Sequence, residues 1–337
     1  MSDKRIILTG DRPTGKLHIG HYLGSILNRL QYQKDHTSYF IIADLHLLTT
    51  SPTMSTEVAK NCEEILIDYL SVGIDPEKAH IFRQSRIPSI PYLACIFSNF
   101  VTVSRASRIP TLKEIMRSLH ISNPSMGLLS YPILQSADIL SVKADLVPVG
   151  KDQKSHIELT REIAREFNSL YCKKAIFPLP LPLIGEVETL IGTDGKNKMS
   201  KSLGNCIYLS DSKKEVTGKV KSMYTDPEKV HINDPGHPEN CPVFLYHKAF
   251  SDNLDRIEEA KIGCKKGTLG CGEHKEELTN ILNSFLDPIR AKRASLENER
   301  DSLIDILTQG EDTVRRKAQD TLDETLGVMK IKTRGNL

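Results

Sequence analysis

Two short segments of the chain carry side chains that can neutralise phosphate. His18 and His21 lie three residues apart near the start of the chain, so they share one face of a helix. Lys198 and Lys201 lie far downstream, in a loop with glycines on both sides. Taken alone, the segments could be incidental surface histidines and a solvated basic loop. Together they indicate an enzyme that activates a carboxylate with ATP, because imidazole N–H and ammonium groups stabilise the growing charge of a phosphate under attack.

The elements that must position these side chains alternate between strands and helices. A turn over 10–15 connects a predicted strand to the helix that begins at His18. This alternation predicts an α/β fold with a doubly wound, Rossmann-like parallel sheet, in which ligands bind beyond the carboxyl ends of the strands. We expect strands over 5–9, 38–43, 79–82 and 145–149, and helices over 18–33, 55–72, 89–103, 126–141 and 152–168.

A proline-rich stretch over 177–182 interrupts this pattern, and the lysine-rich loop follows it. Beyond about residue 207 the apolar residues recur at helical spacing, as at Leu278 and Leu282. We therefore predict two domains, a Rossmann-like catalytic domain over 1–206 and a mainly α-helical domain over 207–337. The last helix is free to pack back on the catalytic domain.

The composition is that of a folded, water-soluble chain. Hydrophobic residues make up 39% and charged residues 26% of the 337 positions, which argues against a disordered chain. The formal net charge of +2 is too small to indicate a nucleic-acid binder by itself. The apolar stretch near the N-terminus is too short for a signal peptide, and no stretch approaches the ~20 apolar residues of a membrane span. We expect a cytoplasmic protein without membrane contact, whose seven cysteines are reduced thiols or metal ligands.

Longer segments carry a resemblance to a known family. Residues 13–24 (PTGKLHIGHYLG), 128–140 (LLSYPILQSADIL) and 147–161 (VPVGKDQKSHIELTR), with KMSKS at 198–202, resemble bacterial tryptophanyl-tRNA synthetases, which are class I aminoacyl-tRNA synthetases. The resemblance implies a homodimeric enzyme that uses ATP and Mg²⁺ to convert L-tryptophan to tryptophanyl-adenylate, with release of pyrophosphate. The tryptophanyl group would then move to the 3′-terminal ribose of tRNA(Trp). The resemblance is weaker after about residue 207.

The same resemblance implies which residues handle ATP. The catalytic residues are expected to be the two histidines and two lysines of the paired signatures, which stabilise charge on the phosphates. The further ATP-binding positions that it implies are Arg12, Thr14, Gly20, Lys113, Gly150, Asp152, Met199 and Ser200. Two positions depart from the family pattern, since many relatives have glutamine in place of Arg12 and methionine in place of Gln135.

Polar residues at helical spacing indicate an amino-acid pocket. Tyr131, Gln135 and Asp138 occupy one stripe of a predicted helix, where an inward stripe would ordinarily be apolar, so a small polar ligand could supply their partners. By resemblance, Asp138 accepts the indole N–H of tryptophan, and Tyr131 with Gln153 holds the α-amino group. The resemblance places His46 near the tryptophan carboxylate or the indole edge. A capping or salt-bridged Asp138 and a structural His46 are the alternatives.

Three cysteines and a histidine show the short spacing of thiolate metal sites. Cys241, Cys264, Cys271 and His274 are separated by 22, 6 and 2 residues. By resemblance, some family members have a fourth cysteine in the last place and hold a [4Fe–4S] cluster. The set with His274 would suit Zn²⁺ or a cluster with one imidazole ligand. A vestigial site with free thiols is the alternative.

Other surfaces and functions stay open at the level of sequence. Basic clusters in the helical region could follow the phosphates of a tRNA, although each alone is usually a solvated helix face. The apolar helix around Tyr92 and Phe97 is either a subunit interface or part of the core. The rival functions are a tyrosyl-tRNA synthetase, a small nucleotidyltransferase with a similar histidine turn, and an inactive paralogue that binds RNA. The intact lysine loop argues against the last two.

Overall fold

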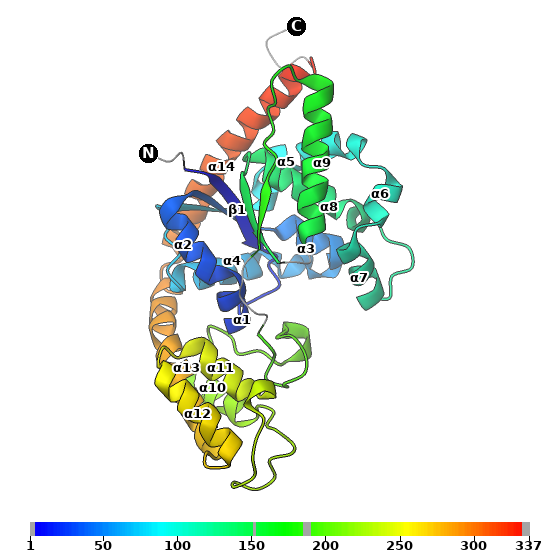
Figure 1. Ribbon diagram of the computed structural model, residues 1–337. Helices are drawn as coiled ribbons and strands as arrows, with labels where there is room; N and C mark the ends of the chain where they lie inside the picture. The colour runs from blue at the N-terminus through cyan, green and yellow to red at the C-terminus, as the bar shows by residue number, and fades with distance from the viewer. Residues whose placement is uncertain (1–3, 151–152, 185–189, 332–337) are drawn as a thin grey trace.

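The structure is a computed structural model that describes residues 4–150, 153–184 and 190–331. Within these ranges, five parallel strands form one sheet in the order β3-β2-β1-β4-β5 (Figure 1). The strands are β1 (Ile6–Asp11), β2 (Thr37–Ile42), β3 (Ala79–Arg83), β4 (Leu146–Val149) and β5 (Leu181–Ile184). The strand order changes direction between β1 and β4, and ligands bind at that point in doubly wound sheets.

Both faces of the sheet are buried, as the continuous apolar strands predict. In β2, Tyr39 and Ile41 point into one hydrophobic core, and Phe40 and Ile42 point into the other. Helices α5, α8 and α9 pack in the first core and α4 packs in the second. The helices of this unit are α1 (Ile19–His21), α2 (Leu27–Asp35), α3 (Asp44–Thr50), α4 (Val58–Ser71), α5 (Ser89–Phe97), α6 (Val103–Ser107), α7 (Pro110–Ser118), α8 (Met126–Ser141) and α9 (Lys154–Tyr171).

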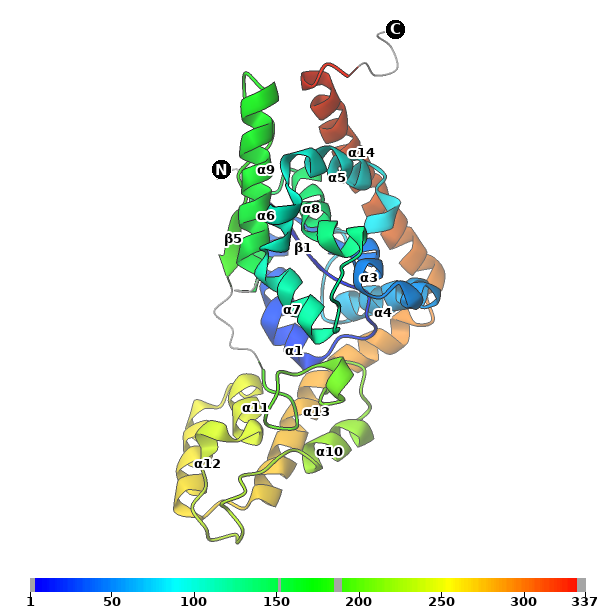
Figure 2. The ribbon, with the colours of Figure 1, turned by 90° about the vertical axis from the view of Figure 1, so that its right-hand side faces the viewer.

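A second unit, made of helices, lies beyond the carboxyl end of the sheet (Figure 2). One of its helices, α13, spans 26 residues and about 39 Å at the usual rise, and it reaches from the far end of this unit back to α4. No strand occurs among described residues 207–331. The helices here are α10 (Lys213–Lys221), α11 (Pro242–Phe250), α12 (Leu254–Lys266), α13 (Cys271–Leu296) and α14 (Arg300–Val328).

The last helix, α14, returns to the sheet and covers its edge strand β3 (Figure 1). The approach is close, because a Cβ atom on Gly310 would lie only 2.0 Å from the backbone oxygen of Ile81. Arg83 at the end of β3 pairs with buried Glu311 at 2.6 Å. An edge strand covered in this way cannot pair with another chain.

The predicted fold class is confirmed: an α/β doubly wound parallel sheet precedes a mainly helical region. Strand β5 was not predicted, because it begins within the proline-rich stretch over 177–182, which indicated an interruption of the pattern. It is an edge strand, where a missing N–H is tolerated. Helices α3, α6 and α7 were also missed, and the helix expected over 89–103 ends at Phe97. No helix formed by the described ranges is long and apolar enough to cross a membrane. The domain boundary at 206 stays a prediction.

Candidate active site

The two signatures lie against each other. Lys201 Nζ donates to Thr14 Oγ1 at 3.1 Å and to the backbone oxygen of Gly15 at 2.8 Å. Buried Met199 faces Gly20, where an added Cβ would lie 3.3 Å from the methionine sulfur and 2.9 Å from His18 Nδ1. A side chain at position 20 would therefore collide with the His18 ring and press on Met199, so glycine is favoured here independently of any approach of a nucleotide.

The two histidines are in ring contact, with centroids 3.7 Å apart. His21 Nδ1 accepts the backbone N–H of His18 at 3.2 Å, so that the proton of the neutral His21 ring is on Nε2, which can donate. His18 Nδ1 is buried and meets no hydrogen-bond partner among the described residues. A π-helical segment, Tyr22–Ile26, follows directly, and such segments frequently occur at functional sites.

Charge and burial keep both rings neutral at physiological pH. Burial, then the positive charge of neighbouring His21 and Lys201, lowers the pKa of His18 to about 3. Burial also lowers the pKa of His21 to about 4, with Lys201 adding to the effect and Asp11 opposing it. Burial lowers the pKa of Lys201 below its ordinary value, and Asp11 opposes that shift as well. The site therefore offers neutral N–H donors and lysine ammonium groups in one place.

A buried acid–base network that the sequence did not single out lies beneath the histidines. Asp11, at the end of β1, accepts from Arg29 Nη1 at 2.6 Å and from the Tyr69 hydroxyl at 2.7 Å. Burial alone would raise the pKa of Asp11, but Arg29 and His21 lower it well below its usual range. The position of Asp11 at the carboxyl end of a central strand was the available signal.

The residues predicted to bind an amino acid form two connected clusters. In the first, Asp138 of α8 is 3% exposed and contacts His46 Nε2 at 2.9 Å, and Gln84 Nε2 donates to its Oδ1 at 2.7 Å. Burial raises the pKa of Asp138, although the bonds from His46 and Gln84 act in the opposite direction. Gln84 was missed, yet it directly follows β3 and so lies at the binding edge of the sheet.

In the second cluster, His156 of α9 joins the predicted residues. Its Nδ1 contacts Gln135 Oε1 at 2.7 Å, and its Nε2 contacts the Tyr131 hydroxyl at 3.0 Å. The Tyr131 hydroxyl also donates to Thr111 Oγ1 at 3.0 Å. Arg12 lies close enough to Tyr131 for the two side chains to interact electrostatically. Arg12 belongs to the same turn as Thr14 and Gly15, and its Nη1 donates to Thr50 Oγ1 at 3.3 Å.

The other predicted positions are placed as follows. Lys198 and Lys113 are exposed, the latter on the helix that supplies Thr111. The Ser200 backbone N–H donates to Asn205 Oδ1 at 2.7 Å. Gly150 accepts from the backbone N–H of Gln153 at 3.0 Å, at the start of α9. Asp152 lies outside the described residues.

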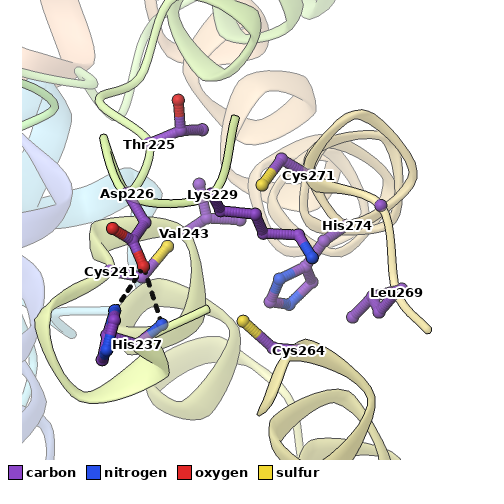
Figure 3. A pocket seen from close by; sticks show the side chains of 11 residues that line it. Thr225, Asp226, Lys229, His237, Cys241, Val243, Cys264, Leu269, Cys271 and His274 are labelled. Atoms are coloured by element: carbon purple, nitrogen blue, oxygen red, sulfur yellow. Dashed lines mark hydrogen bonds and ion pairs between the residues drawn. The ribbon is translucent and has the colours of Figure 1, made fainter. Parts of the chain in front are cut away.

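The thiol set lies in the helical unit, remote from the signatures in sequence. Cys241, Cys264, Cys271 and His274 line one pocket, as predicted from their spacing. The side chain of Lys229 extends into the same pocket (Figure 3). Its Nζ donates to the backbone oxygens of Ile232, at 2.9 Å, and Asp234.

The expected metal site is not supported. No group of three or more His, Cys, Asp or Glu side chains within the described ranges is arranged to hold a metal ion. The physical reason lies in the partners that are already present. His274 Nε2 forms a hydrogen bond with His247 Nδ1, 2.9 Å away. The Lys229 ammonium group supplies positive charge beside Cys264. Neither partner could be inferred from cysteine spacing.

A parallel sheet whose first strand leads into the histidine turn, with the lysine loop closed onto that turn, defines a class I aminoacyl-tRNA synthetase. The chain belongs to the family described as tRNA synthetases class I (W and Y), whose model matches residues 2–287.

The chain aligns with its relatives over nearly the whole length of both proteins. The chain is 48% identical to the tryptophan–tRNA ligase of Treponema pallidum over 330 residues, which cover 97% of each chain. It is also 48% identical to that of Borreliella burgdorferi over 304 residues, covering 90% of this chain and 86% of the relative. The crystal structure of Campylobacter jejuni tryptophanyl-tRNA synthetase complexed with ADP and tryptophan matches with a TM-score of 0.86 at 33% identity, covering 96% and 99% of the two chains.

Proposed function

We propose that this enzyme activates L-tryptophan with ATP and transfers it to tRNA(Trp). The observation that carries the proposal is the contact of the lysine loop with the histidine turn, through Lys201, Thr14 and Gly15. The ligase names of the relatives and the ADP and tryptophan bound by the Campylobacter jejuni protein support the choice of substrates.

In the first step, a tryptophan carboxylate oxygen attacks the α-phosphorus of ATP. The bond from that phosphorus to the bridging oxygen breaks, and the electron pair leaves with pyrophosphate. The neutral rings of His18 and His21 donate N–H groups to the phosphates, and Lys201 and Lys198 take up the charge that develops on the leaving group. Mg²⁺, bound with ATP, would add Lewis-acid polarisation of the phosphoryl oxygens. No covalent bond to the protein is needed, so positioning and electrostatics supply the rate.

Selection for tryptophan is assigned to buried Asp138. Its carboxylate is already oriented by His46 and Gln84. An acceptor held in this way matches the indole N–H, which is a donor only. A substrate without that N–H would leave the acceptor capacity that this buried carboxylate has beyond its bonds to His46 and Gln84 unused, which costs more than the lost contact area.

The second step transfers the tryptophanyl group from AMP to the terminal ribose of tRNA(Trp). We assign catalysis to residues 1–206 and tRNA anticodon binding to the helical region over 207–337, with α14 packed against the sheet. Arg293 is 5% exposed and ion-paired, so it is not among the basic residues available to tRNA phosphates. We place the enzyme in the cytoplasm.

A homodimer is proposed from the exposed apolar residues of α5 and α6. Tyr92 is 49% and Val103 65% exposed, whereas Phe97 of α5 is buried in the core. Phe97 is therefore part of the core. Only the outer face of α5, which carries Tyr92, is available to a second subunit.

The test is the exchange of labelled pyrophosphate into ATP, measured separately with each of the twenty amino acids. We expect exchange with tryptophan only, followed by charging of tRNA(Trp). The family also includes tyrosine enzymes, and a tyrosyl-tRNA synthetase of Archaeoglobus fulgidus shares the fold at 22% identity and a TM-score of 0.67. Exchange driven by tyrosine, or by no amino acid, would overturn the proposal.

A further inference from the structure

The histidine segment over 18–21 is connected on both flanks to one helix of the helical unit, α13. On the first flank, the backbone N–H of Leu17 donates to Asp68 Oδ2 at 2.7 Å. On the second flank, the ring of Tyr22 meets Phe285 in an edge contact, with centroids 4.8 Å apart. Phe285 lies on α13, and so does the charge partner of Asp68.

Asp68 lies on α4, is fully buried and joins two elements. Its second oxygen, Oδ1, accepts from Arg293 Nη1 of α13 at 2.6 Å. A buried carboxylate needs compensation of this kind to stay charged. Burial raises the pKa of Asp68 to about 6, although the Leu17 amide and Arg293 favour the ionised form, so the carboxylate is charged at neutral pH. One carboxylate therefore connects α13 to the residue directly before His18.

Two other carboxylates neutralise the same arginine without taking part in this connection. Glu64 pairs with Arg293 Nη2, and Glu297 accepts from its Nε at 2.9 Å. The Leu17 N–H is a single donor, and it is used by Asp68. The cluster thus contains an internal control: Glu64 shares the ion pair with Arg293, while Asp68 shares the ion pair and also holds the backbone beside His18.

The anchored segment also pairs with the chain that follows the lysine loop. The backbone N–H of Ile19 donates to Ile207 O, and Leu17 O accepts from the N–H of Leu209, both at 3.0 Å. Arg290 of α13 donates to the backbone oxygen of Asp211 at 2.9 Å. A shift of α13 would therefore act on the segments next to both signatures.

We propose that Asp68 and Arg293 are positioning residues for His18, through which helix α13 holds the histidine segment against the triphosphate. The inference rests on the proposed function and assigns no direct contact between these two residues and the substrate. Without the Asp68 carboxylate, the Leu17 amide is released and His18 loses its fixed place. Misplacement of a catalytic group by about 1 Å can lower a rate by up to ~10²-fold.

The test compares Asp68→Ala with the matched control Glu64→Gln in tryptophan-dependent pyrophosphate exchange by the full-length protein. Rates are normalised to the number of active sites, counted from the burst of adenylate formation. For Asp68→Ala we expect kcat to fall at least about tenfold and the KM for ATP to rise, while the KM for tryptophan stays within about twofold. Glu64→Gln should stay within about twofold of the parent in all three constants.

A second measurement separates positioning from general destabilisation. Amide hydrogen exchange should become faster in the peptide containing Leu17 in Asp68→Ala and stay unchanged there in Glu64→Gln. If Asp68→Ala does not fold, Asp68→Asn replaces it, since its side-chain carbonyl can still accept the Leu17 N–H; kcat should then be intermediate. Equal kinetics or equal hydrogen exchange for the Asp68 and Glu64 variants would overturn the positioning role. Absence of exchange in the parent protein would instead overturn the proposed function.

Discussion

The chain contains two sets of four residues whose spacing predicts a site, and the two sets have different outcomes. The histidines and lysines of the signatures come together with donor groups still available, since His18 Nδ1 has no partner among the described residues. The cysteines and His274 also come together in one pocket. There, however, His247 Nδ1 lies 2.9 Å from His274 Nε2, and the Lys229 side chain extends into the pocket.

This difference shows that gathering residues is not sufficient to make a ligand site. A site also needs donors or acceptors that the protein leaves unsatisfied. At the signatures, burial and positive charge leave two neutral imidazoles near lysine ammonium groups, so N–H donors and positive charge are available to a phosphate although the Asp11 carboxylate lies close by. In the thiol pocket, the Lys229 ammonium group already supplies positive charge beside the Cys264 sulfur. The following changes test this contrast, in order of decreasing expected effect.

The largest effect is expected for Lys201→Ala. Removing an ammonium group that acts on the leaving pyrophosphate should lower the rate of adenylate formation by about 10²–10³-fold. The dissociation constant for tryptophan should change little, because Lys201 contacts the Thr14 turn and not the Asp138 cluster. Single-turnover formation of adenylate in a rapid-quench instrument measures the rate. An unchanged rate would show that the lysine loop takes no part in the mechanism. The signatures would then differ from the thiol pocket in no functional respect.

Asp138→Ala should have the next largest effect, on substrate recognition. Loss of a charged acceptor for the indole N–H should raise the KM for tryptophan by roughly 10–100-fold, while the KM for ATP changes far less. Asp138→Asn is the conservative control, since it can still accept one hydrogen bond. Steady-state exchange at varied tryptophan and ATP gives both constants. Equal changes in the two KM values would contradict the pocket assignment.

The two regions should respond together to acid. The pKa values of His18, His21 and His274 are lowered to about 3, 4 and 4, mainly by burial. Between about pH 6.5 and pH 4 the unfolded chain takes up these protons and the folded protein does not. Stability is therefore lost as the pH falls through this window, by about 1.4 kcal/mol per pH unit for each histidine.

Urea unfolding at pH 6.5, 5.5 and 4.5 measures this slope. His274→Gln should reduce it by the share of one histidine. A slope that is independent of His274 would show that this ring is not held neutral in the folded protein.

The smallest effect is expected from removal of metal ions. Dialysis against EDTA should leave the melting temperature of the protein unchanged, because Lys229 already stabilises the loop beside the thiols through the oxygens of Ile232 and Asp234. Lys229→Met should cost about 1–2 kcal/mol of unfolding free energy, since it leaves these backbone acceptors without their donor. Stoichiometric zinc or iron in the purified protein, with melting sensitive to the chelator, would reverse the interpretation of this pocket.

Sequence reasoning reached four of the five strands of the sheet, and the roles of the phosphate-handling residues stay a prediction. Apolar strands such as 38–43 are visible because both faces of a parallel sheet are buried. The same reasoning missed β5, because the proline-rich stretch over 177–182 argues against a strand there. The structure places β5 at the edge of the sheet, where a missing N–H is tolerated. Sequence reasoning also missed Gln84 and His156, because their roles come from hydrogen bonds to Asp138 and Tyr131, 54 and 25 residues away.

The sequence by itself determined the class of the protein and its chemistry, because the histidine turn, the lysine loop and the alternation of strands and helices are local patterns. The tertiary structure alone decided which groups remain available for a ligand. It left His18 Nδ1 without a partner among the described residues, directed His274 toward His247 and connected α13 to the histidine segment through Asp68. The physical reason is that availability depends on every neighbour of a side chain, and those neighbours come from segments far apart in the chain.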